Sequence, residues 1–193
     1  MLEHIRKGVT RTITSVGTFI LAHRGLGVAA AALLFIFAIG LLRPALTIVL
    51  LVGIASLSLV YNRFIQNISL GIELITLATV ITGYAYGGLL AAVVGLVSLF
   101  IAEIISGTLG GKSGISFAGI SIVALLLPLM KHAGWGITAA GIVATLIYDA
   151  IIIPLYLGTG SRLWKSLLFV TTHLLFNIWV FFTIAPIAYR LIA

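Results

Sequence analysis

The chain has 193 residues, of which 62% are hydrophobic and only 8% are charged. A soluble globular domain carries about a quarter charged residues, so this composition excludes an ordinary soluble protein. The net charge of +7 does not indicate a nucleic-acid partner, because the basic residues stand at the ends of apolar segments. The absence of cysteine excludes disulfides, thiolate metal sites and thiol catalysis.

The first segment, residues 1–24, is predicted to be an amphipathic helix lying in the membrane interface. Apolar residues recur every three or four positions from Leu2 to Ile20, while Arg6, Lys7 and Arg11 lie off that face. Burial of the apolar face and attraction to anionic headgroups hold such a helix on a bilayer. The alternative is a plain N-terminal extension of the first membrane span.

The rest of the chain, residues 25–193, is predicted to form an all-α bundle of six to seven transmembrane helices. A crossing needs about 20 mostly apolar residues, and long apolar runs in lipid are helical because helices satisfy their own backbone groups. Arg43-Pro44 is expected to form a tight hairpin between the first two spans, since proline lacks an N–H. The candidate spans are 25–42, 45–61, 69–86, 88–107, 115–130, 136–157 and 166–190.

The basic residues predict a cytoplasmic N-terminus. With seven crossings, most of the 11 Lys and Arg residues fall on the cytoplasmic side, and the exceptions are Arg43, Lys131 and Arg190. This distribution follows the positive-inside rule. A six-crossing layout would place the C-terminus on the opposite side from the seven-crossing one.

Three of the four acidic residues, Glu73, Glu103 and Asp149, fall inside predicted spans. An ionisable group in the bilayer costs on the order of 3 kcal/mol, so such residues usually face the bundle interior and mark function. His173 and Asn177 stand four apart and share a face of the last span. We therefore predict that these five residues line a ligand-binding pocket or ion site. The alternative is that they pair with one another and only fix helix packing.

Signatures of catalysis are missing from the sequence. It contains no Walker lysine motif, no HExxH and no GxSxG, so we expect no enzymatic activity. We also expect no cofactor and no metal site, because the histidines other than His173 lie at segment ends.

Small residues recur every fourth position in several spans, as in Gly27 with Ala31 and in Gly136, Ala140 and Ala144. Such stripes let helix backbones approach closely. Most are expected to serve packing within the bundle. The alternative is a docking surface for another subunit.

The stretch from Ile68 to Ala193 resembles a known family of membrane proteins. The segments that carry the resemblance are ELITLATVITGYAYGG, LLAAVVGLVSLFIAEIISG, the glycine-rich TLGGKSG and HLLFN in the last span. They are similar to the substrate-binding S-components of energy-coupling-factor (ECF) transporters for vitamins and micronutrients. The cell-shape protein MreD looks similar at this level.

The resemblance implies a multi-pass protein of the cell membrane with six helices, both termini in the cytoplasm and a nutrient site near its outer side. It also implies partners: the lipid bilayer, a small-molecule ligand, a membrane coupling subunit and two cytosolic ATPases. The expected function is thus substrate binding for ATP-driven transport. Two alternatives stay open, a structural scaffold of the MreD type and a self-contained ion or proton carrier that uses Glu73, Glu103 and Asp149.

Overall fold

The computed structural model describes the backbone of residues 2–65, 68 and 70–192. Within these ranges it describes the side chains of residues 25, 28, 29 and 32–40 and of every residue from 42 onward. The chain divides into two units, Met1–Ala45 and Leu46–Ala193. Helix α1, Leu2–Leu57, begins in the first unit and ends in the second. The predicted domain boundary after residue 24 stays a prediction.

Helix α1 is continuous through Pro44, so the hairpin predicted at Arg43-Pro44 is wrong. Proline removes one helical hydrogen bond, but apolar surroundings offer the other backbone groups no partner outside the helix, and membrane helices therefore tolerate it. The backbone of residues 2–24 is helical, as predicted. The apolar face predicted for residues 1–24, and the small pair Gly27 and Ala31, lie outside the described side chains.

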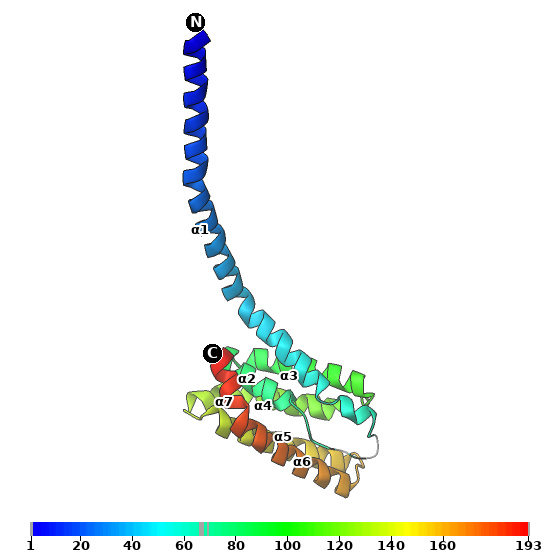
Figure 1. The fold of residues 1–193 in the computed structure, drawn as a ribbon. Helices are drawn as coiled ribbons and strands as arrows, with labels where there is room; N and C mark the ends of the chain where they lie inside the picture. Colours follow the sequence, from blue (N-terminus) through cyan, green and yellow to red (C-terminus); the bar gives the residue numbers. More distant parts are fainter. Residues whose placement is uncertain (1, 66–67, 69, 193) are drawn as a thin grey trace. The chain divides into compact units, whose positions relative to one another are not determined.

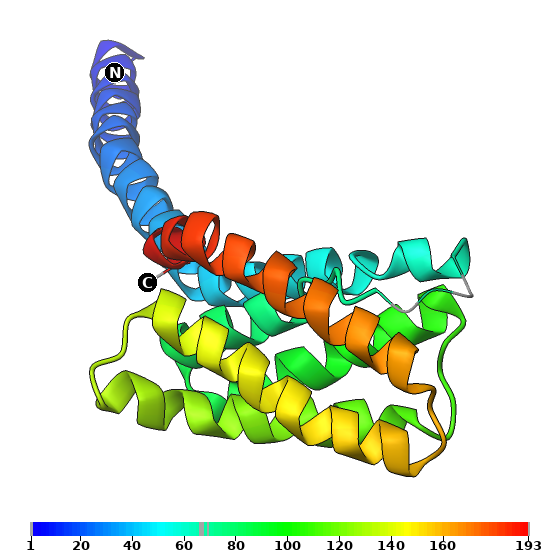
Figure 2. The same cartoon turned by 90° about the horizontal axis from the view of Figure 1, so that it is seen from below.

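The second unit is a helical bundle, and its described residues contain no strand. After α1 come the 3-10 helix η1 and six α-helices, all labelled or traceable by colour in Figures 1 and 2. Their bounds are Val60–Arg63 (η1), Ile75–Tyr86 (α2), Gly88–Ser106 (α3), Ser113–His132 (α4), Ile137–Gly158 (α5), Leu163–Thr183 (α6) and Ala185–Ile192 (α7).

Among the described residues, five helical segments are long and apolar enough to cross a membrane: Leu42–Arg63, α3, α4, α5 and α6. The chain is therefore a multi-pass membrane protein. The spans predicted at 88–107, 115–130 and 136–157 correspond to α3, α4 and α5. The spans predicted at 69–86 and 166–190 are wrong in extent, because residues 70–74 precede helix α2 and the last span is divided between α6 and α7.

Helix α2 lies at the centre of the bundle. It contacts α3, α4, α5, α6 and α7, and every residue from Ile75 to Tyr84 is buried. This position explains why a helix of only 12 residues suffices there, since the surrounding helices and not lipid cover it.

Glycines permit close helix packing around this centre. A Cβ on Gly83 would lie 2.4 Å from Leu127 Cδ1, and one on Gly141 would lie 2.1 Å from Phe181 Cδ1. Ala140 and Ala144 are fully buried on α5. These two residues of the predicted stripe serve packing within the bundle, whereas its first residue, Gly136, is exposed.

Three connections meet at one end of the bundle: the segment after η1, the loop from α3 to α4 and the loop from α5 to α6 (Figure 2). Helices α4 and α6 begin at this end, while α3 and α5 finish there; the segment 70–74 runs inward to the start of α2, which lies beside His173 in the middle of α6. The candidate site lies between these helices.

Candidate functional site

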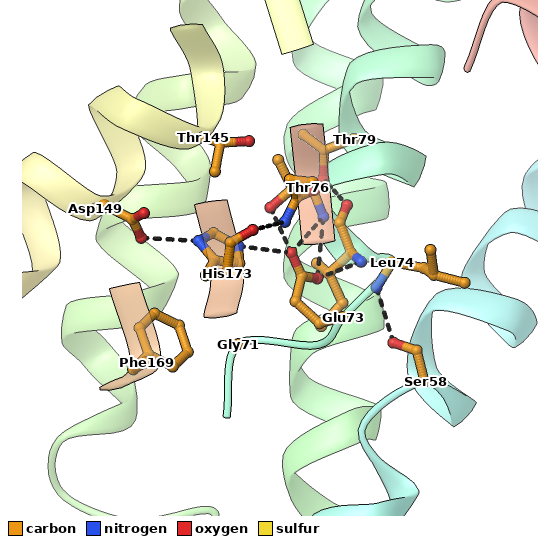
Figure 3. A network of polar contacts seen from close by, with 12 residues as sticks. Ser58, Gly71, Glu73, Leu74, Thr76, Thr79, Thr145, Asp149, Phe169 and His173 are labelled. Carbon is orange, nitrogen blue, oxygen red and sulfur yellow. Dashed lines mark hydrogen bonds and ion pairs between the residues drawn. The ribbon is translucent and has the colours of Figure 1, made fainter. Parts of the chain in front are cut away.

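A buried cluster of three ionisable side chains joins α5, α6 and the segment before α2. His173 Nδ1 lies 2.8 Å from Asp149 Oδ1, and His173 Nε2 lies 3.0 Å from Glu73 Oε1 (Figure 3). Both ring nitrogens face a carboxylate oxygen, which is the arrangement that an imidazolium donating two N–H groups satisfies. His173 is fully buried, and Phe169 stacks on its ring at a centroid distance of 5.1 Å. The imidazole is therefore fixed on both edges and on one face.

Glu73 also accepts the first amides of helix α2. The backbone N–H groups of Ile75 and Thr76 donate to its carboxylate, and the Thr76 hydroxyl donates to Oε1 at 2.6 Å. The first turn of a helix leaves amides without an intrahelical acceptor and carries a partial positive charge. The Glu73 carboxylate accepts from these amides and its negative charge lies at the positive end of the helix.

The segment 70–74, which carries Glu73, is packed directly against α6. A Cβ on Gly71 would lie 2.2 Å from His173 Cβ, so glycine is required at this contact. The Gly71 amide donates to Thr172 Oγ1 at 2.8 Å, and the Leu74 amide donates to Ser58 Oγ at 2.9 Å. Irregular backbone at membrane depth is tolerated where protein covers it or where it lines a cavity.

Beside the cluster lies a cavity of about 730 Å³. Carboxylates, hydroxyls and aromatic rings line it together with three basic residues, of which Lys112 and Arg162 are exposed and Lys165 is half-buried in α6. The polar and aromatic lining side chains are Asn62, Glu73, Thr76, Glu103, Thr108, Ser113, Ser116, Tyr148, Tyr156, Ser161, Ser166 and Phe169, with the basic Lys112, Arg162 and Lys165.

The five predicted site residues are divided by the structure. Glu73 and Glu103 line the cavity, whereas Asp149, His173 and Asn177 are not among its lining residues. Glu73, Asp149 and His173 are in direct contact, and Asn177 Nδ2 donates to the His173 carbonyl at 3.0 Å. Glu103 stands apart from this cluster on α3, and its Oε2 is buried without a hydrogen-bond partner in the described part of the chain.

Sequence reasoning missed Ser116, Tyr156 and Phe169 as parts of the site. The Ser116 and Tyr156 hydroxyls lie 2.8 Å apart and join α4 to α5 at the cavity wall. Helical spacing gave a usable signal, because Phe169 stands four residues before His173, as Asn177 stands four after it.

Within the described residues, no group of three or more His, Cys, Asp or Glu side chains is arranged to hold a metal ion. Both nitrogens of His173 already face carboxylates. The chemistry available here is thus ion pairing and hydrogen bonding to a small molecule, or proton exchange within the cluster.

Comparison of the chain with protein-family models, curated proteins and solved structures finds no match. The functional argument therefore rests on the geometry of the cavity and of the cluster beside it.

Proposed function

We propose that the chain is a membrane-embedded binding subunit for a small molecule and works in transport. The cavity is the observation that carries this proposal. Its volume of about 730 Å³ lies in the range of ligand pockets, roughly 300–1,000 Å³. Polar and ionisable groups inside a membrane bundle are costly and usually mark a substrate path. A scaffold of the MreD type has no need of a polar cavity of this size.

The helix arrangement supports the S-component resemblance. In the described part of the chain, the end of α1 together with α2, α3, α4, α5 and α6 makes six helices. Helix α1 runs through residues 25–57, and the proposal assigns this stretch a single crossing. The proposal takes six crossings from a cytoplasmic N-terminus, with the short helix α2 and the segment before it counted as one, and the cavity then opens on the outer side of the membrane.

The basic residues at the cavity mouth do not contradict this orientation. Lys112, Arg162 and Lys165 line the cavity, so ligand binding accounts for their position. Under the positive-inside rule, the orientation then follows from Arg6, Lys7 and Arg11, which stand before the first span and favour a cytoplasmic N-terminus.

A chain without a nucleotide-binding motif cannot hydrolyse ATP, so uptake needs partners. We propose a membrane coupling subunit and at least one ATPase, as the resemblance implies. Docking would use a face of small residues, with Gly27 and Ala31 the best candidates, because bulk there would hold a partner helix away. Gly27→Leu combined with Ala31→Leu should abolish uptake and spare ligand binding.

A second candidate function is a proton or ion carrier. The chain Glu73–His173–Asp149 favours it, because three ionisable groups within 3.0 Å contacts can exchange protons. The same hydrogen bonds can instead serve only to hold α5, α6 and the start of α2 together.

Purification of a tagged copy in mild detergent separates these functions. A binding subunit should bring down a second membrane protein and an ATPase with a Walker motif. Recovery of cell-wall or cytoskeletal proteins alone would favour the scaffold. Recovery of no partner, together with proton or cation flux in liposomes that Asp149→Asn removes, would favour the carrier.

A further inference from the structure

The two carboxylates of the cavity differ in how they are satisfied. Glu73 accepts from two amides and a hydroxyl and pairs with His173. Glu103 is only 8% exposed, and its Oε2 is buried with no hydrogen-bond partner among the described residues. A buried carboxylate oxygen without a donor is costly and needs an explanation. Glu103 Oε2 is thus the place in the cavity where a hydrogen-bond donor is missing.

The polar neighbours of Glu103 leave its Oε2 unsatisfied. Ser113 accepts from the Gly110 amide at 2.9 Å and has one O–H, which hydrogen-bonds to the Glu103 carboxylate, so it can serve only one of the two oxygens. The Tyr156 hydroxyl, also near Glu103, shares a hydrogen bond with Ser116. A ligand that brings its own N–H donors, and preferably a positive charge, would satisfy the free carboxylate.

The mouth of the cavity has the opposite charge. Lys112 and Arg162 are the residues that precede helices α4 and α6, and Lys165 stands in the first turn of α6. The N-termini of α4 and α6 add partial positive charge to that of the three side chains. An anionic group of the ligand, a carboxylate or a phosphate, fits this basic mouth.

We infer that the cavity takes a small zwitterionic molecule, which places a cationic N–H group on Glu103 and an anionic group at the basic mouth. This inference rests on the proposed function and names the ligand's chemical class. The aromatic side chains Tyr148, Tyr156 and Phe169 also line the cavity and suit a ligand with a flat ring.

Four probes built on one benzene ring test the charge pattern: 4-amidinobenzoate (zwitterion), benzamidine (cation), benzoate (anion) and benzamide (neutral). Their dissociation constants are measured by calorimetry on the detergent-purified full chain. The zwitterion should bind most tightly and benzamide most weakly. A charge-assisted hydrogen bond predicts at least about a tenfold difference between benzamidine and benzamide.

Substitutions assign each charge to its partner. Glu103→Gln should weaken the binding of 4-amidinobenzoate and of benzamidine about tenfold and leave the binding of benzoate unchanged. Arg162→Gln should weaken the binding of 4-amidinobenzoate and of benzoate and leave the binding of benzamidine unchanged. Arg190→Gln is the matched control, because Arg190 stands in α7 and does not line the cavity, and it should change none of the constants. If Glu103→Gln fails to fold, Glu103→Asp is the second variant. It keeps the negative charge but shortens the side chain by one methylene, and it should weaken the binding of the same two probes.

The inference is overturned if benzamide binds as tightly as benzamidine, or if Glu103→Gln changes no constant. It is also overturned if no probe binds, since the cavity has room for all four. The proposed function is tested separately by the mass of any molecule that the protein retains through purification. A retained neutral or purely anionic molecule would leave the binding function standing and refute the zwitterion.

Discussion

Asp149 and Glu103 are both buried acids in membrane helices, yet their surroundings assign them different roles. Each has one buried oxygen without a hydrogen-bond partner among the described residues, Asp149 Oδ2 and Glu103 Oε2. Asp149 pairs with His173 through Oδ1 and does not line the cavity, whereas Glu103 lines it and has no such ion pair. The first carboxylate stabilises the bundle, and the second is available to a ligand.

Matched acid-to-amide substitutions separate these roles. Asp149→Asn removes the charge that pairs with a buried imidazole, so the free energy of unfolding should fall by about 1–3 kcal/mol. Glu103→Gln removes an unpaired buried charge, so stability should stay unchanged or rise. Thermal unfolding in detergent measures both. Equal losses of stability in the two variants would contradict this division.

The sequence alone could identify the residues of the cluster but not their partners. Three acids in apolar spans, and His173 and Asn177 on one helical face, were sufficient signals for an interior polar site. Which acid meets His173 depends on helix order and rotation, because Glu73 is 100 residues away in the chain. No local pattern carries that information.

At the scale of elements, the segment 70–74 couples α2 to α6. Gly71 packs on His173, Glu73 holds the first amides of α2, and the Tyr61 hydroxyl donates to the Leu70 carbonyl at 2.7 Å. The segment therefore shapes one wall of the cavity through Leu70 and Glu73.

Gly71→Ala tests this coupling. The added Cβ meets the α6 backbone, which cannot move aside, so the free energy of unfolding should fall by about 1–3 kcal/mol. Gly53→Ala in α1 is the control, because its Cβ meets nothing within 4 Å and alanine favours helix by up to about 1 kcal/mol. Thermal unfolding of the two variants gives the comparison. A Gly71→Ala protein as stable as Gly53→Ala would show that the segment is not anchored on α6.

Two of the errors in the predicted elements, the hairpin at Arg43-Pro44 and the undivided last span, involve a proline. Pro44, Pro128 and Pro154 all stand inside helices, because apolar segments leave the backbone no alternative partner. Pro186 follows a real break, at Ile184 between α6 and α7. The apolar pattern is the same on both sides of each proline, so hydropathy alone could not distinguish the two outcomes.

At the scale of the whole molecule, the proposal fixes which side the cavity faces. Because the chain has no cysteine, single-cysteine labelling in intact cells is unambiguous. Thr159→Cys, in the exposed loop between α5 and α6, should react with a membrane-impermeant maleimide from outside. Thr12→Cys, among the N-terminal basic residues, should resist labelling. Protection at both positions would support seven crossings and a cytoplasmic cavity, contrary to the proposal.

The central claim is that the cavity holds a small molecule, and native mass spectrometry of the purified protein tests it most directly. The wild type should retain a mass of the size that the cavity admits. Ser116→Phe, which places a ring in the cavity, should lose that mass, while Leu125→Phe on the exposed face of α4 should keep it. Retention of the same mass by Ser116→Phe, or no retained mass in any of the three proteins, would contradict the account.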